Sequence, residues 1–111
     1  MTQTYGPDRI REMNSLAVLA HLRAIEDTTS SQIAAATGLS RTSVNATITD
    51  LERLGWVQSL PPTSPPTGRP AKRYRFRSES GFVLGIDIGA NRIATSLTDL
   101  CGVPVAKNCK D

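Results

Sequence analysis

The basic residues of this sequence gather in one short segment. Five of the 13 Lys and Arg residues lie between positions 69 and 77, and no Asp or Glu lies between positions 56 and 77. Outside this segment acidic side chains outnumber basic ones, so a formal net charge of +3 conceals a stronger local positive charge. Such a cluster is suited to bind a polyanion such as nucleic acid, although a solvated strand whose charges discourage edge pairing has the same composition. The five residues are Arg69, Lys72, Arg73, Arg75 and Arg77.

A second polar surface is expected on a helix that follows Ser40. Its apolar residues recur at helical spacing, at Val44, Ile48, Leu51 and Leu54, and leave the opposite side of its first half without bulky apolar or acidic groups. On that side an Arg can pair with guanine, an Asn with adenine, and hydroxyls with phosphate or base edges; a merely solvated face is the alternative. The candidate DNA-binding residues are Gln32, Ser40, Arg41, Thr42, Ser43, Asn45 and Thr47, together with Arg69, Lys72 and Arg73.

Three helices are predicted to position these side chains. The first runs from Pro7 to about residue 27, with apolar residues spaced by threes and fours. The second covers residues 32–37 and ends at Gly38, which is suited to a left-handed conformation. Leu39 is expected to plug the turn, and Ser40 is expected to cap the third helix, which extends to Gly55.

A β-hairpin is predicted after the third helix. Residues 56–60 form one β-type run, with Trp56 expected in the core, and residues 72–77 alternate between basic and aromatic side chains. Five of the seven prolines lie between these runs, so this segment is expected to be an extended, mobile wing. Gly68 and Pro70 flank Arg69 and make a thin strip that bears one guanidinium group. We therefore expect Arg69 to enter a narrow, A·T-rich minor groove beside the helix.

The remaining residues predict a second, smaller unit. A buried-type strand at residues 82–89, an alternating run at 92–98 and a further strand after Gly102 indicate a three-stranded antiparallel meander. About 30 residues are too few for an independent core. The fold class is α+β, with a winged helix-turn-helix DNA-binding domain at residues 1–77 and the meander at residues 78–111.

Composition excludes several other kinds of protein. His21 is the only histidine, and Cys101 and Cys109 are the only cysteines, so neither a zinc quartet nor a disulfide framework can form, and no cofactor is expected. His21 is expected to be a half-buried helix residue, and both thiols are expected to be reduced. No apolar run approaches the length of a membrane span or signal peptide, which predicts a cytoplasmic protein.

Several segments resemble the ROK family of transcriptional repressors. They are NSLAVLAHLR, SQIAAATGLSRTSVN, LERLGWV, TGRPAKRY and GFVLGIDIGANRIA, and together they extend from about residue 10 to residue 106. The resemblance implies a repressor of sugar-metabolism genes that binds an operator as a homodimer, because a single module buries only about 600–1,000 Å² on DNA. It also implies a sugar or sugar-phosphate effector, bound by a sensor domain that this chain lacks, so the chain is expected to be a truncated form.

The Gly-Ile-Asp-Ile-Gly segment resembles the first phosphate hairpin of sugar kinases. In that family the backbone around Gly89 would approach a nucleotide phosphate, and Asp87 would lie near the metal. The second half-domain, the later catalytic aspartate and the second phosphate loop are missing, so the hairpin is expected to be vestigial and the chain is expected not to be an enzyme. Two alternatives remain open, a winged-helix protein-interaction module and a fragment of a ROK sugar kinase.

Overall fold

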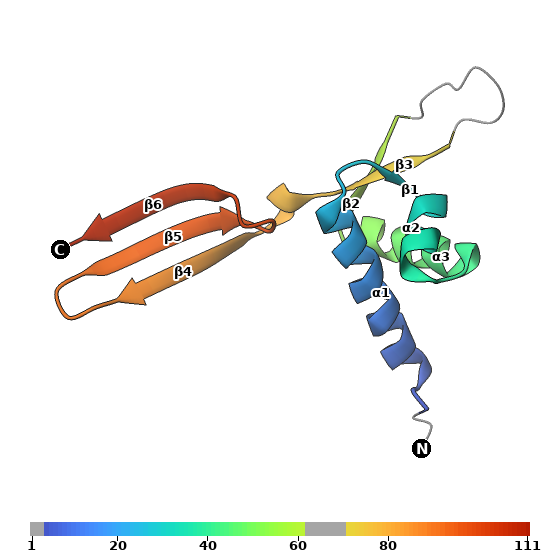
Figure 1. Cartoon of the computed structure of the whole chain (residues 1–111), viewed down its shortest axis with the longest axis horizontal. Helices are drawn as coiled ribbons and strands as arrows, with labels where there is room; N and C mark the ends of the chain where they lie inside the picture. Colours follow the sequence, from blue (N-terminus) through green and yellow to red (C-terminus); the bar gives the residue numbers. More distant parts are fainter. Residues whose placement is uncertain (1–3, 62–70) are drawn as a thin grey trace. The chain divides into compact units, whose positions relative to one another are not determined.

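The computed structural model describes residues 4–61 and 71–111, which divide into two compact units (Figure 1). The first unit ends at Phe76 and contains three helices and three short strands. The second begins at Arg77 and contains three longer strands. The predicted α+β class is confirmed. Within the described ranges, no helix is long and apolar enough to cross a bilayer.

The three helices of the first unit begin and end where local sequence signals favour it. They are α1 (Pro7–Ala24), α2 (Ser30–Thr37) and α3 (Arg41–Arg53). Gly38 ends α2 at φ 76°, a left-handed conformation that glycine adopts at little cost. Ser40 caps α3 through a hydrogen bond from the amide of Ser43. Both of these predicted boundaries are confirmed.

A three-stranded antiparallel sheet completes the first unit. The predicted hairpin is present as β2 (Val57–Leu60) and β3 (Arg73–Phe76), paired from Val57 with Phe76 to Leu60 with Arg73. A short strand that the sequence did not predict, β1 (Thr28–Thr29), pairs with the other edge of β3. The order β1-β3-β2 therefore places the base of the hairpin next to the first turn of α2.

The core of the first unit lies between the helices and β3. Leu39 packs against this core, as expected for the residue that plugs the turn. The N-terminal half of α1 projects beyond the other two helices (Figure 1), and its apolar Ile10, Met13 and Leu16 are exposed rather than part of the expected buried side. The buried hydrophobic residues are Val18, Leu22, Ile33, Val44, Ile48, Leu51, Val57 and Tyr74.

Two apolar residues expected in the core are exposed. Trp56 is 38% exposed, because side chains alternate along the chain entering β2 and the next residue, Val57, takes the inward position. Leu54 is 65% exposed, because α3 ends at Arg53 and Leu54 follows the last helical turn. The predictions that Trp56 anchors the hairpin in the core and that Leu54 extends the buried row of α3 are therefore wrong.

The second unit is the predicted antiparallel meander. A 3-10 turn (Ser78–Ser80) precedes β4 (Phe82–Ile88), β5 (Ile93–Asp99) and β6 (Pro104–Lys110), with β5 in the middle. Lys110 pairs with Ile93, so the C-terminus lies beside the turn between β4 and β5 (Figure 1). No side chain between residues 77 and 111 is buried, since a single small sheet has no second layer to cover it.

Candidate nucleic-acid interface

The exposed face of α3 presents polar side chains without a hydrogen-bond partner among the described residues. Arg41, Thr42 and Asn45 are exposed, and their side chains make no hydrogen bond to any residue in the described ranges. The first acidic residue of this helix is Asp50, which pairs with Arg53 three residues later. The N-terminal half of α3 can therefore approach a polyanion without desolvating a carboxylate.

The serines at the start of α3 serve the helix itself. The hydroxyl of Ser40 accepts a hydrogen bond from the amide of Ser43 at 3.0 Å and donates one to the Ser43 hydroxyl, also at 3.0 Å. This cap satisfies one of the amides that the first turn leaves without an intrahelical partner. Ser40 and Ser43 therefore fix the start of the helix that carries Arg41 and Thr42.

Thr47 does not belong to this exposed face. It is only 7% exposed, and its hydroxyl donates to the carbonyl oxygen of Ser43 at 2.8 Å. Residues three and four apart share one side of a helix, so Thr47, three residues after Val44 and four before Leu51, belongs to the buried stripe. The expectation that Thr47 faces outward with Arg41 and Asn45 is wrong.

Gln32 is exposed, but its side chain takes part in the cap of α2. Its amide oxygen accepts hydrogen bonds from the backbone amide of Thr29 at 3.0 Å and from the Thr28 hydroxyl at 3.3 Å. In return, the Thr29 hydroxyl accepts from the backbone amide of Gln32. This reciprocal capping box fixes where α2 begins, next to the sheet.

Lys72 and Arg73, the two other basic residues predicted to contact DNA, lie at the base of the hairpin and differ in their contacts. Lys72 is exposed and has no ion pair among the described residues, whereas Arg73 is engaged inside the protein. The Arg73 guanidinium pairs with Asp27 and donates to the carbonyl oxygen of Pro61 at 2.8 Å, while its Nε is buried with no hydrogen-bond partner among residues 4–61 and 71–111. Arg69 lies outside the described residues.

A groove of about 530 Å³ separates the exposed face of α3 from β3. Arg41, Asn45 and Thr49, spaced four residues apart, line it from the helix. Lys72 and Tyr74 line it from the hairpin, and the first turn of α2 contributes further residues. The structure therefore brings together candidates from both parts of the sequence, since Arg41 and Asn45 of α3 share one groove with Lys72. The full lining is Thr29, Ser30, Ser31, Arg41, Asn45, Ile48, Thr49, Glu52, Ala71, Lys72 and Tyr74.

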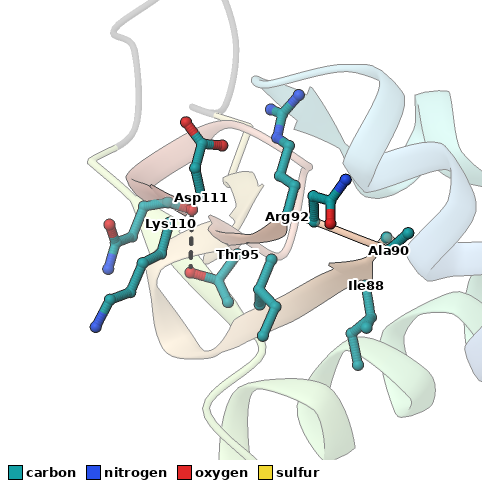
Figure 2. A pocket seen from close by; sticks show the side chains of 10 residues that line it. Ile88, Ala90, Arg92, Thr95, Lys110 and Asp111 are labelled. Carbon is teal, nitrogen blue, oxygen red and sulfur yellow. Dashed lines mark hydrogen bonds between the residues drawn. The ribbon is translucent and has the colours of Figure 1, made fainter.

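The candidates in the second unit, Asp87 and Gly89, line two different hollows. Gly89 lines one of about 710 Å³ between the β4–β5 turn and the end of β6, whose labelled lining residues in Figure 2 include Arg92 and Thr95. Asp87 lines another, with Lys107. The Gly89 amide already donates to the carbonyl oxygen of Arg92 at 2.7 Å. The role of Asp87 and Gly89 stays a prediction that rests on the resemblance.

Comparison with known proteins identifies the first unit. A model of the MarR family matches residues 12–69, a range that contains α2, α3, β2 and most of α1. The chain belongs to the MarR family. It is thus a winged-helix protein of a family of DNA-binding transcription regulators, and three helices followed by a hairpin are the parts that such a fold requires. No curated protein matches the sequence.

A solved structure extends the similarity of this MarR-family chain into the second unit. It is described as the crystal structure of a ROK family transcriptional regulator, homologous to the E. coli MLC protein. The similarity has a TM-score of 0.71 at 16% sequence identity and covers 92% of this chain. It therefore confirms that winged helix and meander share the fold of that regulator. The chain corresponds to only 26% of the regulator's length.

Sequence reasoning missed two features of the MarR-family domain. The spacing Thr29-x-x-Gln32 is a capping-box pattern, and it marks the true start of α2, at Ser30. The contact of Arg73 with Asp27 joins residues 46 positions apart, and no local pattern in the sequence indicates it. Arg73, which is predicted to contact DNA, therefore also contacts Asp27 and Pro61 at the base of the hairpin.

Proposed function

We propose that this chain binds a specific sequence in double-stranded DNA and represses transcription, with α3 in the major groove. The observation that carries the proposal is the exposed, acid-free face formed by Arg41, Thr42 and Asn45, whose side chains have no hydrogen-bond partner in the described ranges. A major groove about 12 Å wide admits one helix, and such side chains suit guanine, phosphate and adenine respectively. In this proposal Ser40 and Ser43, at the N-terminal end of α3, and Gln32, at that of α2, also lie against the DNA.

The hairpin supplies the second contact of the proposed complex. Lys72 is exposed at its base, and Arg69 follows Gly68 in the loop, so both are placed in the proposal on the phosphates and the adjacent minor groove. An A·T-rich flank would favour Arg69, because a narrow minor groove has an enhanced negative potential. In this proposal Arg73 supports the hairpin through its contacts with Pro61 and Asp27.

Pairing of two copies and control by a small molecule belong to the same proposal. A homodimer on a pair of half-sites would bind more tightly than one module, and the meander, whose outer strand edges are unpaired, is the proposed contact between copies. The resemblance to ROK repressors supports sugar-metabolism genes as targets and a sugar or sugar-phosphate effector in a full-length form.

Selection from a random duplex pool, followed by salt titration, tests the proposal. We expect one enriched sequence with an A·T-rich flank, and an affinity whose logarithm falls with the logarithm of salt concentration by about 0.9 for each phosphate neutralised. Arg69→Ala is expected to weaken binding and to remove the preference for A·T at the flank. If duplex does not bind at low or high salt, the proposal fails and a protein-interaction module becomes the better explanation.

A further inference from the structure

The exposed face of α3 changes in chemistry beyond Asn45. The exposed side chains up to Asn45 carry hydrogen-bond donors, whereas Ala46 and Thr49, which follow, are small and uncharged. Residues 44, 47, 48 and 51 are buried, so Ala46 and Thr49, three residues apart, lie together on the outward side of the helix. The surface that α3 offers to DNA in the proposed complex therefore has a polar end and a small, uncharged end.

The hydroxyl of Thr49 is engaged within the helix. It donates to the carbonyl oxygen of Asn45, four residues earlier, at 2.9 Å. Thr47 makes the same kind of bond to Ser43, but Thr47 is buried, whereas Thr49 is exposed and lines the groove between α3 and β3. A hydroxyl has one proton to donate, so Thr49 has no donor left for a ligand. What it adds to the exposed surface is its methyl group, next to that of Ala46.

Methyl groups at this place favour one base over the others. In the major groove every base presents hydrogen-bonding groups, and thymine alone adds an apolar group, its C5-methyl. The methyl groups of Ala46 and Thr49 can remove water from that C5-methyl without leaving a buried polar group unpaired. Cytosine presents an amino donor instead, which Ala46 cannot accept, so its desolvation would carry a cost.

The position of Thr49 relative to Asn45 predicts where this thymine lies. Four residues of an α-helix rise about 6 Å, and successive base pairs are about 3.4 Å apart. Asn45 and Thr49 both line the groove of about 530 Å³, so a ligand can approach both. A helix in the major groove would therefore place Thr49 within about two base pairs of the base that Asn45 contacts.

We propose that Thr49, supported by Ala46, is a specificity-determining residue that selects thymine through its C5-methyl group, within about two base pairs of the base pair contacted by Asn45. The inference rests on the proposed function. It adds to the interface two residues that are not among the predicted DNA contacts, and it names the base and the chemical group that they recognise.

Substitution of thymine by deoxyuridine tests the inference, because uracil lacks only the C5-methyl group and still pairs with adenine. The thymines of a duplex selected from the random pool are replaced one at a time, and binding is measured by fluorescence anisotropy. We expect one replacement to weaken binding by wild type about fourfold, as for one lost methyl contact, and the other replacements to have smaller effects.

Two variants of Thr49 separate its methyl group from its hydroxyl. Thr49→Ser keeps the hydroxyl that bonds to Asn45 and removes the methyl group, so it should bind thymine and uracil equally well at that position. Thr49→Val keeps the methyl group and removes the hydroxyl, so it should retain the fourfold preference. Thr37→Ser is the matched control, because the Thr37 hydroxyl makes the same kind of bond, to Ile33 in α2, and Thr37 does not line the groove. This control should bind as wild type does.

The outcomes distinguish a failed inference from a failed function. If wild type binds duplex but Thr49→Ser keeps the preference for thymine, or Thr49→Val loses it, the methyl contact is refuted and the proposed function stands. A selected site without thymine within about two base pairs of the position that depends on Asn45 refutes the contact as well. If wild type binds no duplex, the proposed function fails and the methyl contact fails with it.

Discussion

Replacing Arg73 by methionine should weaken DNA binding while leaving the first unit almost as stable as before. Methionine retains an apolar stem, so the packing under β3 persists, but the contacts to Asp27 and to the Pro61 carbonyl oxygen are lost. The Arg73 side chain is 25% exposed and that of Asp27 is 46% exposed, so solvent screening limits their ion pair to about 1 kcal/mol at most.

The remaining contributions of Arg73 nearly cancel. The hydrogen bond to Pro61 contributes about 1 kcal/mol, and the buried Nε, which has no partner in the described part of the chain, costs about 1–3 kcal/mol in the wild-type protein. Arg73→Met removes all three terms, so the free energy of unfolding should change by no more than about 1 kcal/mol. Asp27→Ala removes only the ion pair and leaves the guanidinium partly buried, so it should be at least as destabilising as Arg73→Met.

DNA binding should respond differently, because the Arg73 side chain holds Pro61, the residue that follows the end of β2. Without this hydrogen bond the end of the hairpin is held less firmly, and its proposed contact with DNA weakens. We expect the dissociation constant of Arg73→Met for duplex to rise by about 3- to 10-fold. Urea unfolding followed through the fluorescence of Trp56, the single tryptophan, and anisotropy titration measure the two effects.

Two results would refute this reasoning. A loss of more than about 2 kcal/mol in Arg73→Met would mean that the guanidinium stabilises the fold and that its buried Nε is not a cost. An unchanged affinity for duplex would mean that the wing does not depend on Arg73. Arg11→Met, at an exposed position of α1 that does not line the groove, controls for the loss of one positive charge.

Three further predictions concern the helices. Thr47→Val should change duplex affinity less than twofold, because Thr47 is buried and faces away from the exposed side of α3; a large loss in anisotropy titration would contradict this. Ile48→Ala should lower the free energy of unfolding by about 2–5 kcal/mol in urea titration, because Ile48 is 2% exposed in the core. Gly38→Ala should cost about 1–2 kcal/mol through its left-handed φ of 76°, although a Cβ there would meet open space; an unchanged melting temperature would show that the turn relaxes.

Local signals in the sequence were sufficient to predict most of the first unit. Gly38 and Ser40 each act on backbone groups within a few residues, so the end of α2 and the start of α3 follow from residue type. The hairpin follows from alternation in residues 72–77, where Tyr74 is buried and Lys72 is exposed. These features depend on neighbours along the chain, which a sequence displays directly.

The predictions failed or were incomplete where the outcome depends on which side of a helix is buried or on contacts between residues distant in sequence. Thr47 is polar, and it was assigned to the exposed face by type although its spacing from Val44 and Leu51 places it on the buried side. The contact of Arg73 with Asp27, distant in sequence, was not predicted, and a contact of Arg73 with DNA stays a prediction.

The base preference of Asn45→Ala, compared with that of wild type in selections from one random duplex pool, tests the central claim most directly. If α3 lies in the major groove, the variant should lose its preference at a single base-pair position, worth about 1–3 kcal/mol, and keep it elsewhere. Asn45 is exposed and unbonded in the described protein, so its fold should be unaffected. An identical base preference in both selections, or an equal loss at every position, would contradict the placement of α3.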